Sequence, residues 1–222
     1  MYNKSIFSIA EVGRLIMRIL HIVCLRLSHS VSMWICTVLT KGYWKSIGVI
    51  LGKECKFFGL PIIQLSRRGK MVVGSRVKFV SRFRSNMVGL MTPCTIQLMS
   101  DGHLEIGDDS GFSGVVISCR DKITIGSRVK VGGNVRIFDH DYHSLDYEVR
   151  SSSEDFKRAK SCPIHIGDDV FIGTNAIVLK GAMIGARSII GAGAVVSGSV
   201  PEDSIVVGNP AEVIRRTSVL VS

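Results

Sequence analysis

The sequence predicts an all-β solenoid, and three columns of residues carry this prediction. Between residues 166 and 200 an aliphatic side chain returns at every sixth position, a spacing that neither an ordinary helix nor an alternating strand produces. A small or medium-sized residue stands two positions before most of these, and glycine follows four of them. Period six in parallel columns is typical of a hexapeptide β-helix. The aliphatic column consists of Ile166, Ile172, Val178, Ile184, Ile190 and Val196.

In this architecture three short strands form one turn of roughly 18 residues, and successive turns stack. The aliphatic column fills the interior, and the small residues fit the inner corners. Glycine tolerates the backbone angles that a corner demands. Because one turn is too short to bury a core alone, the core exists only when turns are stacked.

Composition fits a coil filled by isoleucine and valine. The 222 residues include 46% hydrophobic residues but only 7% aromatic residues, which favours a solenoid over a sandwich built on large rings. The six cysteines are scattered and form no C-x-x-C pair. That distribution favours buried or free thiols in a reducing compartment over a disulfide framework or a zinc cluster.

The formal net charge of +10 calls for a partner or another explanation. The sequence contains no nucleic-acid-binding module and no interleaving of basic with aromatic residues, so we expect no nucleic acid partner. Anionic lipid headgroups or a phosphorylated cofactor account for the excess more simply. The alternative is that the charge only aids solubility.

Residues 1–45 differ from the rest and are expected to form one or two amphipathic helices. Arg14, Arg18 and Arg26 interrupt the apolar run, so no stretch reaches the roughly 18 uncharged residues that a spanning helix needs. Two interpretations stay open: the helices lie in a membrane interface as a peripheral contact, or they cap the first turn of the solenoid. A signal peptide is not expected, because no small-residue cleavage site follows the short apolar run.

The solenoid is expected to span residues 46–216, with a short tail at 217–222. An aliphatic residue followed by glycine opens a block at four earlier points, and the segment GSRVK occurs at both 74–78 and 126–130. The openings lie 22, 33 and 19 residues apart, so loops or bulges interrupt the early turns. These openings are Leu51, Val73, Ile106 and Ile125.

The largest interruption is a loop expected at about 138–161. From Ile125 to the next equivalent position, Ile166, the distance is 41 residues, which exceeds one turn by about 23. Long loops on a rigid scaffold are commonly functional. The front half holds His140 and His143 among aspartates, and the back half, SSSEDFKRAK, is expected to be a mobile tip.

The histidines of this loop are candidates for acid–base chemistry. An imidazole oriented by a carboxylate or a carbonyl is suited to removing a proton from a hydroxyl group. His140, His143 and His165 could equally act together as metal ligands. As a third interpretation, any one of these histidines could simply be a solvated loop residue. Residue chemistry alone does not choose among general base, metal ligand and solvated residue.

The region from Ile125 to Arg216 resembles the hexapeptide-repeat acyltransferases. Three segments carry the resemblance, in the order in which they occur in that family: NVRIFDHDYHSLDYEVR, IHIGDDVFIGTNAIVLKGAMIGARSIIGAGAVV and PEDSIVVGNPAEVIRR. The chain is similar to galactoside and maltose O-acetyltransferases, and more so to the O-acetyltransferases of bacterial polysaccharide gene clusters. The resemblance implies a left-handed parallel β-helix, a homotrimer, and acetyl-CoA bound between neighbouring subunits.

The resemblance also implies roles for particular residues. His143 matches the family's general base, and His140 is the second candidate. The resemblance does not assign the acid that orients the base; Asp139 and Asp141 are both within reach in sequence, and Asp141 is the catalytic candidate. Ser113 falls where the family carries an acceptor-side asparagine, and Asp139 is a second candidate for substrate binding.

For acetyl-CoA, the acyl donor, the matching positions are Thr174, Ala192 and Ser197, with Arg215 near the phosphates. The implied reaction is direct acetyl transfer to a hydroxyl of a sugar or polysaccharide precursor, without an acyl-enzyme and without a metal. Two other functions stay open: a metal enzyme of the γ-carbonic anhydrase kind, and a non-catalytic scaffold in a polysaccharide assembly complex. The expected location is the cytoplasm, with peripheral contact on the inner face of the membrane through residues 1–45.

Overall fold

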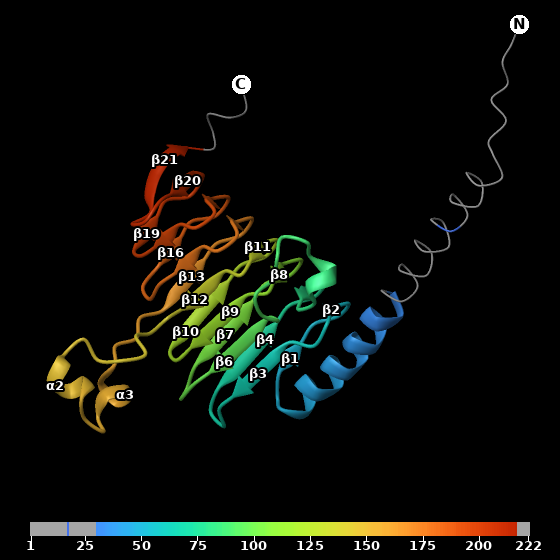
Figure 1. Cartoon of the computed structure of the whole chain (residues 1–222), viewed down its shortest axis with the longest axis horizontal. Helices are drawn as coiled ribbons and strands as arrows, with labels where there is room; N and C mark the ends of the chain where they lie inside the picture. Colours follow the sequence, from blue (N-terminus) through green and yellow to red (C-terminus); the bar gives the residue numbers. More distant parts are fainter. Residues whose placement is uncertain (1–16, 18–29, 217–222) are drawn as a thin grey trace, which may run out of the picture.

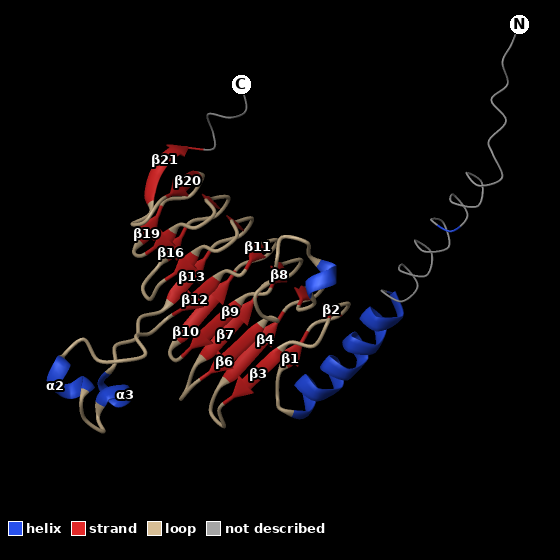
Figure 2. Cartoon of the chain, viewed as in Figure 1, coloured by secondary structure: helices blue, strands red, loops and turns tan. Residues whose placement is uncertain are grey.

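The computed structural model describes residue 17 and residues 30–216, which form a coil of three parallel sheets with a helix at one end (Figures 1 and 2). Each turn contributes one strand to each sheet, so neighbours within a sheet are three strands apart in the chain. Within these residues, β21 alone among the named strands pairs antiparallel, where it returns along β20. This is the architecture that period six predicts.

The three faces of the coil are called sheets A, B and C. Sheet A consists of β1 (Ile50–Leu51), β4 (Lys70–Val73), β7 (His103–Ile106), β10 (Lys122–Ile125), β13 (Ile164–Ile166), β16 (Met183–Ile184) and β19 (Ser199–Val200). Sheet B consists of β2 (Lys56–Phe58), β5 (Lys78–Val80), β8 (Gly111–Ser113), β11 (Lys130–Gly133), β14 (Phe171–Ile172), β17 (Ile189–Ile190), β20 (Ser204–Val207) and β21 (Glu212–Arg216). Sheet C consists of β3 (Ile62–Leu65), β6 (Thr95–Leu98), β9 (Val116–Cys119), β12 (Arg136–Phe138), β15 (Ile177–Val178) and β18 (Val195–Val196).

The four block openings predicted from the sequence occupy one stacked position of sheet A. Leu51 pairs with Val73, and Val73 pairs with Ile106. Ile106 in turn pairs with Ile125, and Ile125 pairs with Ile166. The periodicity predicts this register correctly because each aliphatic residue must point into the same interior.

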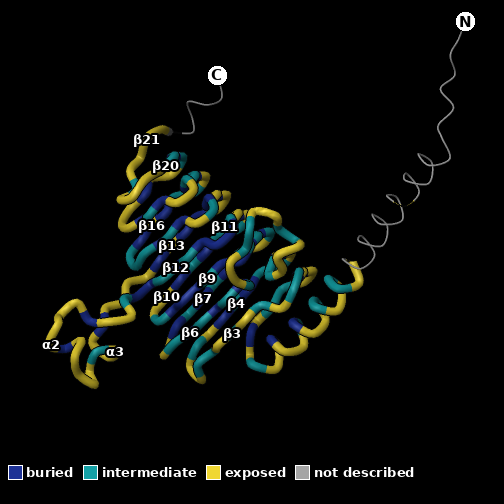
Figure 3. Tube along the Cα trace, viewed as in Figure 1, coloured by how far each residue is buried: buried dark blue, intermediate teal, exposed yellow. Residues whose placement is uncertain are grey.

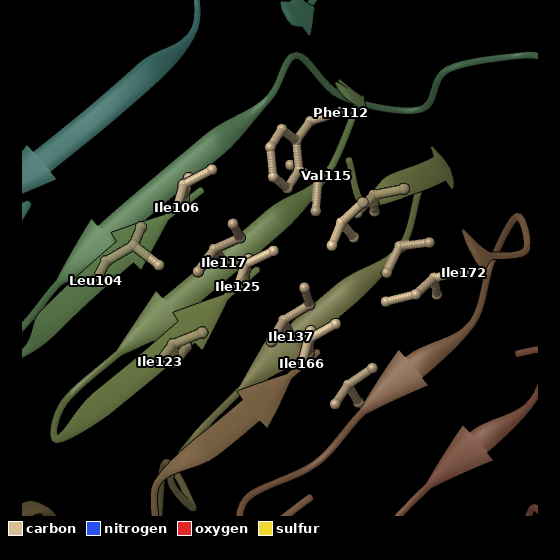
Figure 4. Close-up of a cluster of buried hydrophobic side chains, with 14 of the residues drawn as sticks. Leu104, Ile106, Phe112, Val115, Ile117, Ile123, Ile125, Ile137, Ile166 and Ile172 are labelled. Atoms are coloured by element: carbon tan, nitrogen blue, oxygen red, sulfur yellow. The ribbon is translucent and has the colours of Figure 1, made fainter. Parts of the chain in front are cut away.

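Stacked aliphatic side chains fill the interior of the coil (Figure 4). Buried positions recur along its strands (Figure 3). Ile137 and Ile166 come from different sheets and are both 0% exposed. Full burial of such a side chain stabilises the fold by about 1.5–3 kcal/mol. The predicted corner residues Ala176 and Ala194 are also buried, at positions where a larger side chain would overpack the turn.

The first turns use aromatic side chains instead. Phe57, Phe79 and Phe112 stack in register along sheet B, with successive ring centroids 5.3 and 5.2 Å apart. A helix covers residues 30–46. Its Trp44 closes the aromatic stack edge-on, with its ring centroid 5.0 Å from that of Phe57. The helix therefore caps the solenoid by completing its hydrophobic core.

The rest of the predicted N-terminal extension, residues 1–16 and 18–29, and the tail at 217–222 lie outside the described residues. None of the helices formed by the residues that the structure describes is long and apolar enough to cross a membrane.

The repeated GSRVK segments form equivalent corners. Arg76 and Arg128 both adopt a left-handed backbone conformation, with φ of +58° and +59°. Each guanidinium reaches one turn along the coil and forms two hydrogen bonds of 2.7 Å, Arg76 with Asp109 and Arg128 with Asp169. The internal repeat thus marks a link between successive turns.

Two insertions explain the two longest spacings, the 33 residues from Val73 to Ile106 and the 41 residues from Ile125 to Ile166. Residues 81–94, between β5 and β6, carry the short 3₁₀ helix η1 (Phe83–Ser85) and leave the coil where sheet B passes into sheet C, the B–C edge. Residues 139–161, between β12 and β13, are the predicted long loop and leave where sheet C passes into sheet A, the C–A edge. This second loop contains α2 (Tyr147–Arg150) and α3 (Asp155–Arg158) and projects away from the coil (Figure 1).

Candidate active site

The root of the 139–161 loop is closed by backbone pairing. His140 forms an antiparallel bridge with Ser161, and the Asp141 N–H donates to the Lys160 carbonyl over 2.8 Å. The Cys162 N–H donates to the Asp139 carbonyl, also over 2.8 Å. The two ends of the insertion are therefore held together at the C–A edge, and the segment between them is presented from a fixed base.

Asp139 and His140 form a buried pair at this root. Both side chains are 0% exposed, and the Asp139 Oδ1 lies 2.9 Å from the His140 Nδ1. The same carboxylate accepts hydrogen bonds from the Arg120 and Asp121 N–H groups, at 2.8 and 2.9 Å. Its proximity also raises the pKa of the Cys119 thiol, after the larger effect of burial. Asp139 thus joins one turn of the coil to the loop.

The His140 Nε2 has no hydrogen-bond partner in the structure and is buried. The Tyr142 ring packs against the imidazole edge-on, with ring centroids 4.6 Å apart. His140 therefore sits behind the loop surface, where it supports the loop from inside. Because this nitrogen is buried, an acceptor hydroxyl could reach it only if the side chains that cover it moved.

Asp141 is engaged with the next turn of the coil. Its Oδ1 lies 2.6 Å from the Lys180 Nζ, and both side chains are largely buried, with 22% and 30% exposure. Lys180 follows β15 at the C–A edge, so the ion pair fixes the loop root one turn further along. Asp141 faces this lysine rather than His143.

His143 is presented outward and is oriented by a carboxylate from α3. The His143 Nδ1 lies 2.5 Å from the Asp155 Oδ2, while the imidazole remains 70% exposed. Asp155 also accepts a hydrogen bond of 2.6 Å from the Ser144 N–H. The bond from His143 and that from Ser144 hold the pKa of Asp155 below its ordinary value. A carboxylate on Nδ1 leaves Nε2 as the nitrogen that can accept a proton from a substrate.

Asp155 was not among the residues expected from the sequence. It lies 12 positions beyond His143, in the half of the loop expected to be a mobile tip. That half forms α3 and returns against the front of the loop. Asp146 caps α2 through the Glu148 and Val149 N–H groups, which starts the turn that brings α3 back. An aspartate in the first turn of a helical stretch was the available signal.

The B–C edge gathers a different set of predicted residues. Ser113 ends β8 at this edge, whereas Thr174 and Ala192 follow β14 and β17, and the turn of β11 lies between those of Ser113 and Thr174. The Thr174 Oγ1 donates to the Gly133 carbonyl over 2.7 Å, and the Gly193 N–H donates to the Thr174 carbonyl over 2.9 Å. Space is open within 4 Å of where a Cβ of Gly193 would lie, so a narrow ligand can approach the backbone here.

The 81–94 loop folds against the same edge. The buried Asn134 side chain accepts a hydrogen bond of 2.7 Å from the Met91 N–H and donates one of 2.9 Å to the Gly89 carbonyl. A Cβ on Gly133 would meet the Thr174 hydroxyl at 3.4 Å and the Leu90 side chain at 3.5 Å. The loop therefore forms one wall beside Thr174, a wall that the sequence did not locate.

The remaining predicted residues lie elsewhere. Ser197 is exposed after β18 at the C–A edge, one turn beyond Lys180. Arg215 is exposed on β21 and pairs with Ile205. The structure therefore brings Ser197 to the edge of the loop but leaves Thr174 and Ala192 across sheet C from His143.

The three histidines considered as metal ligands are not brought together within the chain. His140 is bound to Asp139, His143 to Asp155, and His165 is exposed on sheet A beside Met183. In the portion of the chain that the structure covers, no three His, Cys, Asp or Glu side chains gather as a metal-binding set.

One segment of the chain matches a known protein family. Residues 163–198 match the family described as bacterial transferase hexapeptide (six repeats). The chain carries the hexapeptide repeat of bacterial transferases. The match covers the most regular part of the coil and ends just after β18.

Relatives of this hexapeptide-repeat protein include two from Escherichia coli. It is 34% identical over 106 residues to a putative lipopolysaccharide biosynthesis O-acetyl transferase, covering 46% of this chain and 54% of that protein. It is 36% identical over 94 residues to a galactoside O-acetyltransferase, covering 42% and 44%. The chain thus spans about half the length of the curated relatives it matches.

Among solved structures, a hexapeptide-repeat-containing acetyltransferase from Vibrio cholerae superposes with a TM-score of 0.55 at 25% identity, over 81% of this chain and 80% of that one. The expected resemblance to hexapeptide-repeat transferases is confirmed. The predicted fold class, a left-handed parallel β-helix, is confirmed as well.

Proposed function

We propose that this protein is an acetyl-CoA-dependent O-acetyltransferase that acts on a hydroxyl of a sugar or polysaccharide precursor at the cytoplasmic side of the membrane. The His143–Asp155 pair is the observation that carries the proposal, because it is an outward-facing imidazole with an ordered carboxylate behind it. The names of the two Escherichia coli relatives support acetyl transfer to a sugar.

In the proposed reaction His143 acts as the general base. Its Nε2 takes the proton of the acceptor hydroxyl while that oxygen attacks the thioester carbonyl. Asp155 holds the tautomer that leaves Nε2 free and stabilises the imidazolium that forms. The new C–O bond replaces the C–S bond, and His143 returns the proton to the departing thiolate. Backbone N–H groups would stabilise the negative charge that develops on the carbonyl oxygen.

Acetyl-CoA would supply the acetyl group as an activated thioester, and the B–C edge fits its narrow arm. Thr174 and Ala192 present small side chains there, and the space beside Gly193 is open. Ser113, on the same edge, would face the acceptor. Ser197 and Arg215 remain candidates for more distant parts of the cofactor, with the exposed guanidinium suited to phosphate.

His143 and these cofactor positions lie on different edges of sheet C, so we propose that the site is completed between copies of the chain. A homotrimer would bring the C–A edge of one copy to the B–C edge of the next. The projection of the loop away from its own coil supports this arrangement (Figure 1). Asp139 and Asp141, whose carboxylates are already engaged within the chain, would act as positioning residues.

The experiment that tests this function is an acetyl-transfer assay over sugar acceptors with the His143→Ala chain. We expect the rate to fall by about 10²–10⁴ while acetyl-CoA still raises the melting temperature. His165→Ala is the matched control and should keep the wild-type rate. An unchanged rate in His143→Ala would sink the proposed base, and an equal loss in His165→Ala would favour the metal enzyme.

A non-catalytic scaffold is the second candidate. It would show no transfer to any acceptor and no change of melting temperature with acetyl-CoA. The exposed His143–Asp155 pair disfavours it, because a scaffold has no need of an ordered imidazole facing solvent.

A further inference from the structure

The helix at residues 30–46 exposes an apolar face. Val31, Trp34, Ile35, Val38 and Leu39 recur at the spacing of one helix face, and each is between 44% and 65% exposed. In Figure 3 exposed segments recur along this helix between intermediate and buried ones. These five residues are called the apolar helix face. A contiguous apolar surface of this kind on a soluble protein marks an interaction site.

The opposite face of the helix is already occupied. Trp44 is 0% exposed against the aromatic stack, and Thr40 is 3% exposed. The Thr37 Oγ1 accepts a hydrogen bond of 3.0 Å from the Phe57 N–H. The helix is therefore fixed to the coil, and its apolar helix face cannot turn inward without breaking the cap.

The distribution of charged residues along the chain indicates what binds to the apolar helix face. Residues 1–100 contain 15 Lys and Arg but only 2 Asp and Glu, whereas residues 101–222 contain 13 and 16. The whole positive excess thus belongs to the end of the chain that carries the helix. Lys41 and Lys45 continue the stripe of Trp34 and Val38 along the helix, and Arg82 donates to the Ser32 hydroxyl over 2.6 Å at its other end.

We infer that the apolar helix face docks on an anionic membrane surface, with the helix lying in the interface plane. A bilayer carrying acidic headgroups complements both the apolar side chains and the surrounding lysines and arginines. A second copy of the chain is the weaker occupant, because two such basic ends would repel each other. The inference does not depend on acetyl transfer, since docking requires neither His143 nor acetyl-CoA.

The two tryptophans of the chain provide an internal readout, because Trp34 is 65% exposed while Trp44 is buried. Vesicles of phosphatidylcholine with phosphatidylglycerol should shift the emission of the full-length chain to shorter wavelength, whereas phosphatidylcholine alone should not. Trp34→Phe should lose this shift but still sediment with the anionic vesicles. A shift that persists in Trp34→Phe would contradict insertion of the apolar helix face.

Substitutions then test affinity by cosedimentation with the same vesicles. The Trp34→Glu/Val38→Glu chain should bind at least about tenfold more weakly. Lys41→Gln should weaken binding by about fivefold at low salt and less at high salt. Met183→Glu, an equivalent exchange at a 49% exposed position on sheet A, is the matched control and should bind like the wild type.

Unchanged melting temperatures would show that the variants fold. Absence of binding by the wild-type chain, or equal binding by the double variant, would overturn the inference. If the double variant instead changed only the oligomeric state in sedimentation velocity, a second copy would cover the face and the inference would be wrong.

Discussion

The two edges of sheet C are built from the same repeat, yet they present different chemistry. The B–C edge offers small side chains and open backbone at Thr174, Ala192 and Gly193. The C–A edge carries an insertion in which His143 meets Asp155 and Lys180 meets Asp141. The repeat by itself thus provides small side chains and open backbone, whereas the imidazole and its carboxylate lie in a segment that leaves the repeat. We propose that the two edges meet only between copies.

Beyond the His143→Ala exchange, the largest effect should come from filling the B–C edge. Ala192→Trp places a large ring on the exposed B–C edge. We expect the Kd for acetyl-CoA to rise at least about a hundredfold, which corresponds to a loss of about 2.7 kcal/mol of binding free energy. Calorimetry measures this change. The melting temperature should stay unchanged, because Ala192 is exposed and contributes nothing to the core. If this variant binds acetyl-CoA with wild-type affinity, the cofactor does not bind at the B–C edge.

Asp139 tests whether the loop root is structural. Its buried carboxylate accepts hydrogen bonds from the Arg120 and Asp121 N–H groups and holds His140. Asp139→Asn should lower the free energy of unfolding by about 2 kcal/mol, measured by denaturant titration. Asp121→Asn, at the exposed neighbouring position, is the control and should change it little. A fully stable Asp139→Asn chain would show that the buried pair is dispensable.

Asp155 tests orientation without loss of the base. Asp155→Asn should lower the turnover rate by about tenfold, because His143 then samples the wrong tautomer. Its Kd for acetyl-CoA should match that of the wild type, and its melting temperature should fall only slightly, by the contribution that the carboxylate makes to stability. Glu154→Gln, one residue earlier, changes a side chain that pairs with Lys157, and this variant should behave like the wild type. If Asp155→Asn is fully active, the carboxylate does not position the base.

The smallest effect concerns the titration of Asp155. Hydrogen bonds from His143 and Ser144 lower its pKa, so NMR should find it below the ordinary value of about 3.9. In His143→Ala the pKa should rise toward that value. Because the folded pKa is depressed, the contribution of this carboxylate to stability is present above about pH 3.9 and is lost as the pH falls through the folded pKa. An identical pKa in both chains would mean that the hydrogen bond does not form in solution.

Much of the fold could be predicted from the sequence, because every inward-facing position of the coil requires an apolar side chain. Leu51, Val73 and Ile106 occupy one stacked position even though insertions separate them. The 41-residue spacing before Ile166 also located the long loop. The same spacing argument showed that another insertion exists, but it could not place residues 81–94, because a loop can leave any corner without altering the count.

The site was less predictable because its contacts are not periodic. Sequence proximity favoured Asp139 and Asp141 as partners of the histidines, yet Asp141 binds Lys180, which lies 39 residues away. The partner of His143 is Asp155, which returns through two short helices that no repeat specifies. Likewise, period six does not reveal that Thr174 and His143 fall on opposite edges of one sheet.

The central claim is that one copy supplies the general base and another copy supplies the B–C edge at which the cofactor binds. It can be tested by refolding a mixture of His143→Ala chains and Ala192→Trp chains and measuring acetyl transfer at an acetyl-CoA concentration too low to occupy the Ala192→Trp chains, where each parent alone shows little transfer. In mixed oligomers an intact C–A edge can meet an intact B–C edge, so the account predicts that activity returns. If mass spectrometry shows mixed oligomers and the mixture stays as inactive as its parents, the site is not divided between copies and the account is wrong.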